Sequence, residues 1–305
     1  MPAFEIQTFE EYLNVIKNEI RVLRPYYRGQ SRTASDGYKL QPSIGRYKNL
    51  NSKTLTQLKD LENSVLETFS NHVLAHVNHI PRNDWEMLAL AQHHGLPTRF
   101  MDWTTNPLVA LYFATRETKK NKEGENVDSA VYVLTQKTIR YNELKRNGPE
   151  VEPIEEEDAL SKEVESNDPY SSFDVEPEIA AEPSTPIEPE DQSIPDSRKL
   201  DEIPATEDQS GDLNSPFQIA YNVMYDPPHV SPRIRAQDGV LMACHRPLIP
   251  MDETEYLEIL IKNQSHDEIR RRLDQFGVFD KQLFPDLDGM AKWLKFRVFE
   301  IDGAI

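Results

Sequence analysis

The chain has 305 residues and a formal net charge of −18 at pH 7, from 52 acidic and 34 basic side chains. This length is enough to bury a hydrophobic core in one large domain or two small ones. The acidic total disfavours nucleic acid and anionic membranes as ligands, and no apolar run approaches the ~20 residues of a membrane-spanning helix. The first residues lack the regions of a signal peptide and Cys244 has no cysteine to pair with, so we expect a cytoplasmic protein.

Most of the negative charge falls in one segment, residues 149–215. Its 22 acidic and three basic residues give it −19, which leaves +1 for the rest of the chain, so the total does not exclude a phosphate-bearing ligand. Nine of the 22 prolines and only two aromatic residues lie in it, too little apolar surface to offset the entropy of ordering. We expect this segment to be a disordered insertion that divides one domain into residues 1–148 and 216–305. Its role is either that of a solvated spacer or that of an acidic mimic of nucleic acid.

The first of these two blocks is expected to be mainly helical. Apolar residues recur at every third or fourth position, as on the buried face of a helix. Capping boxes and one Asn-Pro pair mark helix starts, because their side chains accept hydrogen bonds from the first free amides. The predicted helices are 8–24, 55–73, 83–95 and 106–112, and the predicted strands are 26–29 and 130–134.

The second block is expected to hold most of the strands. Runs of β-branched and aromatic residues predict strands at 217–225, 239–245 and 256–261. Helices are predicted after Ser265, ending near Gly277, and after Asp286. Helices early and strands late, without a repeating alternation, favour a single mixed α+β domain over a doubly wound sheet.

The densest group of functional side chains is residues 93–104, HHGLPTRFMDWT, which we expect to form a loop between two helices. A loop held by rigid elements commonly carries binding residues. From the residue types alone a structural role is favoured, because Arg99 can pair with Asp102 and Trp103 can anchor the core.

Two other segments place arginine near glycine. In residues 26–30, YYRGQ, the guanidinium can reach a phosphate while glycine lets the main chain approach closely. Residues 233–239, RIRAQDG, are expected to form a solvated turn before a core strand.

No metal site is predicted from the histidines and cysteine. The neighbouring His93 and His94 would point about 100° apart on a helix, so both cannot readily bind one ion. The sequence also contains no HExxH or paired CxxC motif, the spacings typical of zinc sites. Cys244 and His245 are expected on opposite faces of a strand, where they cannot act as a nucleophile and its base.

The order of these motifs resembles the FRG domain family of bacteria and phages. The resemblance spans residues 26–294 and includes a modest exchange, since the name-giving Phe-Arg-Gly is Tyr-Arg-Gly here. The acidic insertion is outside the family pattern. The matching motifs are Tyr27-Arg28-Gly29, residues 92–104, residues 235–239 (RAQDG) and residues 284–290 (FPDLDGM).

The layout of the first three motifs is also similar to that of ADP-ribosyltransferases. This similarity implies a split-sheet fold and NAD as the substrate, with Arg28 holding its phosphates or ribose. Gln237 then takes the position of the catalytic acid. An amide can orient a ribose by hydrogen bonds, but it cannot supply the negative charge that stabilises an oxocarbenium ion. The adjacent Asp238 would face the other way on a strand.

We therefore predict a pocket for a nucleotide or NAD-like ligand, with transfer or cleavage at the nicotinamide ribose if the protein is an enzyme. Two other classes stay open: a non-catalytic module that binds a protein target, and a hydrolase or nuclease using His94 or His245 with Asp102, which lacks a companion nucleophile or metal. The predicted catalytic residues are Arg28, His94 and Gln237, and the predicted ligand-binding residues are Tyr27, Gly29, Thr98, Arg99, Asp102 and Trp103.

Overall fold

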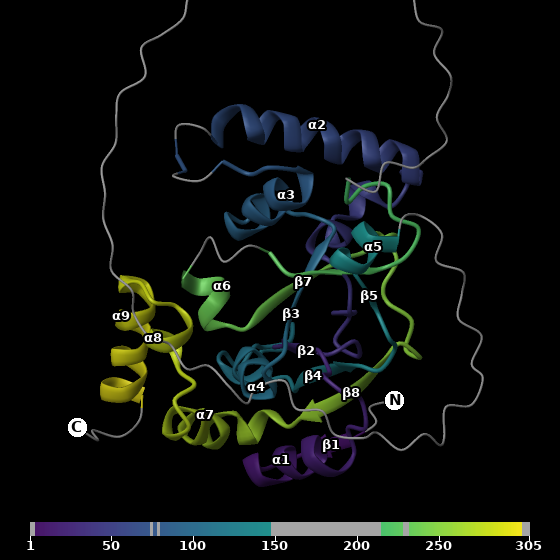
Figure 1. Ribbon diagram of the computed structural model, residues 1–305. Helices are drawn as coiled ribbons and strands as arrows, with labels where there is room; N and C mark the ends of the chain where they lie inside the picture. Colours follow the sequence, from purple (N-terminus) through teal and green to yellow (C-terminus); the bar gives the residue numbers. More distant parts are fainter. Residues whose placement is uncertain (1–3, 74–75, 78–79, 148–214, 228–231, 301–305) are drawn as a thin grey trace, which may run out of the picture. The chain divides into compact units, whose positions relative to one another are not determined.

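The computed structural model describes residues 4–73, 76–77, 80–147, 215–227 and 232–300. All but the last residue of the predicted acidic insertion lies outside these ranges. The described residues form an α+β fold around one mixed sheet of eight strands, in the order β1-β8-β4-β2-β3-β7-β6-β5 (Figure 1). The strands are β1 (Phe4–Ile6), β2 (Tyr27–Gln30), β3 (Phe100–Thr104), β4 (Ser129–Leu134), β5 (Ile139–Arg140), β6 (Val223–Tyr225), β7 (Gly239–Ala243) and β8 (Tyr256–Ile261).

Strands from both ends of the chain interleave in this sheet. β7 and β8, from the second block, pair with β3 and β4 from the first. β1 with β8 and β5 with β6 are parallel pairs, and the remaining pairs are antiparallel. The expectation that strands concentrate late in the sequence was wrong, because β1 to β5 all precede the acidic segment.

The sheet is nearly divided between β2 and β3. These two strands share a single residue pair, Tyr27 with Thr104. β2 pairs with β4 over four residues, and β3 pairs with β7 over five. The sheet therefore consists of two halves, β1-β8-β4-β2 and β3-β7-β6-β5, that diverge from one point of contact.

Helices begin where local capping signals predict them in four cases. The side chains of Thr8, Asn83, Asn106 and Asp286 accept hydrogen bonds from main-chain amides, whereas Ser265 makes no such bond. The α-helices are α1 (Phe9–Asn18), α2 (Leu55–Val73), α3 (Asp84–His93), α4 (Pro107–Thr115), α5 (Tyr141–Asn147), α6 (Pro232–Ala236), α7 (His266–Gln275), α8 (Asp280–Leu283) and α9 (Leu287–Lys295). Short 3₁₀ helices are Ser43–Arg46, Lys48–Leu50 and Asn263–Ser265, and a π-helix is Phe296–Glu300.

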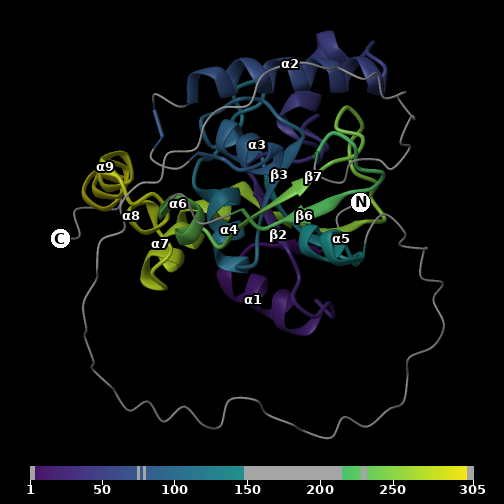
Figure 2. The same ribbon diagram turned by 45° about the horizontal axis from the view of Figure 1, so that its top comes forward.

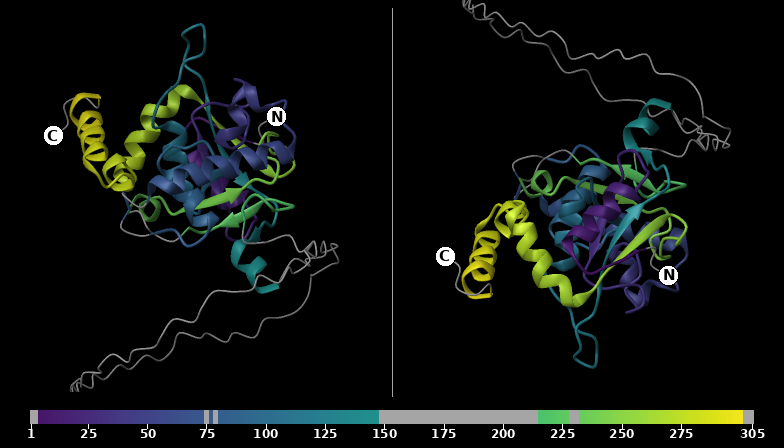
Figure 3. Two further views of the ribbon diagram at one scale, coloured as in Figure 1. Left: turned by 90° about the horizontal axis from the view of Figure 1, so that it is seen from above. Right: turned by 90° about the horizontal axis from the view of Figure 1, so that it is seen from below.

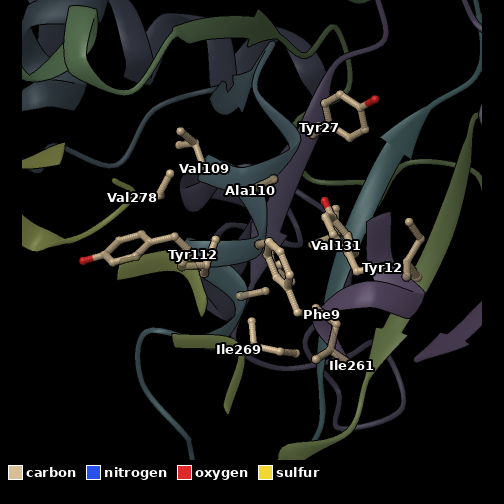
Figure 4. Close-up of a cluster of buried hydrophobic side chains, with 14 of the residues drawn as sticks. Phe9, Tyr12, Tyr27, Val109, Ala110, Tyr112, Val131, Ile261, Ile269 and Val278 are labelled. Atoms are coloured by element: carbon tan, nitrogen blue, oxygen red, sulfur yellow. The ribbon is translucent and has the colours of Figure 1, made fainter. Parts of the chain in front are cut away.

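Helices α1, α4 and α7 cover one face of the first half of the sheet. Burial of their apolar side chains against β2, β4 and β8 forms the largest core cluster, which Figure 4 shows in close-up. It includes Phe9, Tyr12, Tyr27, Val109, Ala110, Tyr112, Val131, Ile261, Ile269 and Val278.

Helix α3 covers the second half of the sheet, and α2 lies over α3 (Figure 2). Trp85 of α3 packs against Phe100 and Tyr225 of the strands. Tyr27 and Thr104 stand directly opposite each other, so their side chains share a face. Helices α4 and α3 therefore cover the same face on the two sides of the split. The C-terminal helices α7 to α9, in yellow, gather at one side of the sheet (Figure 3).

Four predicted boundaries or elements were wrong. α1 ends at Asn18, well before Pro25, and of the predicted strand 217–225 only Val223–Tyr225 is a strand. The last five residues of the predicted loop 93–104 form strand β3, and most of the predicted turn 233–239 is helix, in α6. No helix in the described residues is long and apolar enough to cross a membrane.

His266, at the start of α7, is a fully buried histidine. Its Nδ1 lies 3.0 Å from the hydroxyl of Thr118 and its Nε2 lies 2.9 Å from that of Ser129. Burial, with a smaller effect of Arg270, lowers the pKa of His266 to about 4. An unfolded chain binds this proton near pH 6.5, so stability that is present above that pH is lost as the pH falls toward 4.

We expect the free energy of unfolding to fall by about 2 kcal/mol between pH 7 and pH 4.5 through His266 alone. Urea unfolding at the two pH values measures this fall, and carboxylates contribute to it in every variant. The matched comparison is therefore the His266→Gln variant. Its free energy of unfolding should fall by about 2 kcal/mol less between the two pH values than that of the unmodified protein. Equal pH dependence in the two proteins would contradict the assignment.

Candidate functional site

A cavity of about 300 Å³ opens where β2 and β3 diverge. We call it the central cavity. Helices α3, α4 and α6 supply its walls, and β2, β3 and β7 supply its floor. Its volume is at the lower end of the range for small-molecule sites.

Arg28 of β2 bridges the split in the sheet. Its Nη1 donates a hydrogen bond of 2.5 Å to the main-chain oxygen of Asp102 on β3, and lies 3.8 Å from Oδ2 of the same residue. The guanidinium thus occupies the place that the main chain of β2 would take if the strands stayed paired. The side chain is 19% exposed, and its buried Nε has no partner among the described residues.

Trp103 supplies a second unpaired donor. The residue lines the central cavity and is only 2% exposed, and its Nε1 is buried without a hydrogen-bond partner in the described part of the chain. Buried donors are seldom left unpaired, because each one loses its hydrogen bonds with water. Trp103 belongs to the same core cluster as Met101 and Met242, on the face of the sheet opposite Asp102, so its indole nitrogen is buried in the core and is not a donor at the cavity surface.

Asp102 is the one carboxylate among the described residues that line the cavity. Its Oδ1 accepts a 2.7 Å hydrogen bond from Nε2 of Gln92. The Oε1 of Gln92 accepts from the hydroxyl of Thr98, whose oxygen in turn accepts from the amide of Phe100 at 3.0 Å. This chain of hydrogen bonds fixes the orientation of the Asp102 carboxylate.

Two further side chains with basic groups line the cavity. His93, at the end of α3, has a lowered pKa because of burial, His94 and Arg233, with Asp102 acting in the opposite direction. Arg233 of α6 lies with its guanidinium 4.3 Å from the centre of the Phe284 ring. Burial lowers the pKa of Arg233, with a smaller effect of Arg116, while Asp286 and Asp102 act in the opposite direction.

Gln237 lines the central cavity at the end of α6. Its Nε2 donates to the main-chain oxygen of Leu283 at 3.0 Å, and its own main-chain oxygen accepts from the hydroxyl of Thr104. Asp238 has a left-handed main chain with φ 45°, and its carboxylate accepts from Asn106. Asp238 lines a separate hollow, so its carboxylate does not replace Gln237 in the cavity.

The structure brings six of the nine predicted site residues to the central cavity and leaves three outside it. His94 is exposed at the end of α3, and Thr98 acts on the cavity only through Gln92. Arg99 is 3% exposed and pairs with the buried Glu62, so it is neither a cavity residue nor the partner of Asp102. The six predicted residues that line the cavity are Tyr27, Arg28, Gly29, Asp102, Trp103 and Gln237.

Sequence reasoning missed several cavity residues that helical spacing could have found. Gln92 and His93 lie three and four residues after Ala89, and all three share the face of α3 that lines the cavity. Arg233 and Gln237 are four residues apart, a spacing that places them on one side of α6. Reading residues 233–239 as a turn concealed this pair.

The remaining histidine and the cysteine lie elsewhere. Nδ1 of His245 lies 3.1 Å from the side-chain oxygen of Asn222. Burial raises the pKa of the Cys244 thiol to about 12, so the thiol stays protonated. Within the described ranges, no group of three or more His, Cys, Asp or Glu side chains is placed to hold a metal ion.

The family model of the FRG domain matches residues 24–123. This stretch contains β2, α3, β3 and α4, and with them Arg28, Asp102 and the hydrogen-bond chain behind Asp102. Residues 24–123 therefore match the FRG domain that the motifs indicated, while the motifs at residues 235–239 and 284–290 lie outside the match. Gln237 and Arg233 lie beyond the matched residues. Comparisons with curated proteins and with solved structures gave no match.

Proposed function

We propose that the central cavity binds a phosphate-bearing nucleotide of the NAD class. The observation that carries the proposal is Arg28, a permanently charged side chain that lines the cavity and is held in the split of the sheet by its bond to Asp102. A phosphate offers several acceptors to a planar guanidinium.

Charge supports the same class of ligand. Arg28 and Arg233 both bring a permanently charged group to the cavity, which α3, α4 and α6 partly close to water. Attraction between opposite charges strengthens as water is excluded. The diphosphate group is therefore the part of NAD or ADP-ribose that these arginines attract.

The proposed chemistry is cleavage at the nicotinamide ribose, as in ADP-ribosyltransferases. The bond between ribose C1′ and the nicotinamide nitrogen breaks, its electron pair leaves with nicotinamide, and an acceptor such as water adds to C1′ and loses a proton. Gln237 would orient the ribose by hydrogen bonds. A neutral amide does not stabilise the developing positive charge, so the expected turnover is slow and binding is the primary measurement.

We predict that Arg28→Gln and Arg233→Gln each weaken NAD binding by roughly 10-fold or more, because each loses a hydrogen bond between charged groups. Arg235→Gln is the matched control, since Arg235 is also on α6 but lines the separate hollow with Asp238. Calorimetric titration with NAD and with ADP-ribose measures the affinities. Release of nicotinamide, followed by chromatography, measures turnover.

Thermal unfolding of each variant separates lost binding from lost structure, which matters for Arg28 because it also bonds to β3. Equal losses in Arg233→Gln and Arg235→Gln would contradict a role for this cavity. A folded protein that binds neither NAD nor ADP-ribose would overturn the proposal and favour a non-catalytic interaction module.

A further inference from the structure

We infer that Asp102 makes the central cavity selective for ligands that carry free sugar hydroxyls next to their phosphate, that is, ribonucleotides rather than deoxyribonucleotides. This inference rests on the proposed function and names the part of the ligand that the arginines do not explain. It assigns Asp102 as a specificity-determining residue.

An anion that carries no hydrogen-bond donors does not suit the central cavity. Oδ2 of Asp102 lies 3.8 Å from Nη1 of Arg28, so a phosphate held by Arg28 is also close to a carboxylate. An ionised carboxylate only accepts hydrogen bonds and repels another anion. A ligand that offsets this repulsion has to bring hydrogen-bond donors to Asp102.

The carboxylate of Asp102 is held in place, and one of its oxygens can still accept hydrogen bonds from a ligand. Its Oδ1 is occupied by Gln92, which Thr98 orients in turn. Its Oδ2 has no hydrogen bond within 3.5 Å from any described residue, and the side chain is 71% exposed. A fixed carboxylate with one free oxygen can accept two hydrogen bonds from neighbouring hydroxyl groups.

The ligand's donors to Asp102 are expected to be uncharged. Nη1 of Arg28, 3.8 Å from Oδ2 of Asp102, already places a positive charge beside that oxygen and disfavours a second one from an ammonium or guanidinium group on the ligand. Hydroxyl groups donate without adding charge. A ribose phosphate places such hydroxyls and an anion on one sugar, and a deoxyribose removes one of them.

The test compares ADP, 2′-deoxy-ADP, 3′-deoxy-ADP and inorganic pyrophosphate by calorimetric titration of the full chain. The unmodified protein should bind ADP roughly 10-fold more tightly than at least one of the deoxy analogues, the worth of one hydrogen bond to a charged group. Asp102→Asn should lose most of this preference.

Pyrophosphate should show the opposite response. It has no hydroxyl to donate, so removal of the negative charge in Asp102→Asn should tighten its binding while ADP binding weakens. Gln92→Leu, which leaves the carboxylate but removes its hydrogen bond, should also lower the preference for ADP and so separates positioning from charge.

The matched control is Asp238→Asn, which neutralises a carboxylate outside the cavity at a left-handed position that asparagine accepts. It should retain the preference of the unmodified protein. Equal binding of ADP and both deoxy analogues, or an Asp102→Asn variant with an unchanged preference, overturns the inference and leaves the proposed function intact. Failure of every nucleotide to bind overturns both.

Discussion

Gly29→Ala should destabilise the folded domain by about 3 kcal/mol or more, at the upper end of the cost of overpacking. A Cβ built on Gly29 of β2 would lie 1.8 Å from the main-chain oxygen of Ala110 and 2.7 Å from the amide nitrogen of Ala114, both in α4. The helix has to move away from the sheet to make room, which opens the core cluster between them (Figure 4). In thermal unfolding we expect a fall in Tm of about 6–12 °C for each 3 kcal/mol.

Gly239→Ala is the control for this prediction. Its added Cβ would lie 3.4 Å from the nearest atom, the main-chain oxygen of Ile234, and should be tolerated. A second variant, Gly29→Ala with Ala110→Gly, should not recover stability, because the obstructing atom belongs to the main chain and not to the side chain of Ala110. A Gly29→Ala protein as stable as Gly239→Ala would show that α4 does not approach β2 this closely.

The close approach of α4 gives the Arg-Gly pair a structural meaning. Gly29 lets α4 lie on β2, and α4 carries Phe113 into the wall of the central cavity. Arg28, the neighbour of Gly29, bridges the split in the sheet. One residue of the pair therefore positions a wall of the cavity, and the other lines the cavity at the split in the sheet.

Helix starts were predictable because a cap is satisfied within a few residues. The side chain of Asn83 accepts from the amide of Glu86, and that of Asn106 from the amides of Leu108 and Val109, as their spacing indicated. Ser265 has the same spacing but lies in a 3₁₀ turn and makes no cap. Local chemistry thus predicts where helices begin better than how their first turn is built.

Strand β3 was not predictable from such local signals. Phe100, Met101 and Trp103 are all buried, as in a central strand, but Asp102 stands between them with an exposed side chain. A charged residue is tolerated there because β2 turns away to pair with β4 and leaves space beside β3. That divergence depends on strand pairing between distant parts of the chain, which the pattern around residue 102 does not contain.

In the candidate site, too, some residues were predictable from local motifs and others depended on contacts between distant parts of the chain. The motifs placed Arg28, Asp102 and Gln237 in one cavity, since each marks an element that the fold brings to the split. They did not distinguish His93 from His94, a choice set by the rotation of α3 on the sheet. They also placed Arg99 with the ligand, although its partner Glu62 comes from α2, a helix the motifs do not include.

Arg99 and Glu62 lead to the second large expected effect. The two side chains are each 4% exposed, and Nε of Arg99 donates to Oε1 of Glu62 at 3.0 Å while Nη2 donates to Oε2. Nη1 of Arg99 donates to the main-chain oxygen of Pro216 at 3.1 Å. The pair therefore joins α2, the entry to β3 and the chain that returns after the acidic segment.

We expect Arg99→Met or Glu62→Leu to lower the free energy of unfolding by about 3–5 kcal/mol, because each leaves an unpaired charge in the core. Arg99→Met with Glu62→Leu should recover most of the loss, since an apolar pair of similar volume avoids the cost of removing two charges from water. Urea unfolding of the three variants gives the coupling energy between the two positions. Additive losses in the double variant would mean that the ion pair is not what destabilises each single variant, and that Arg99 acts mainly through Pro216.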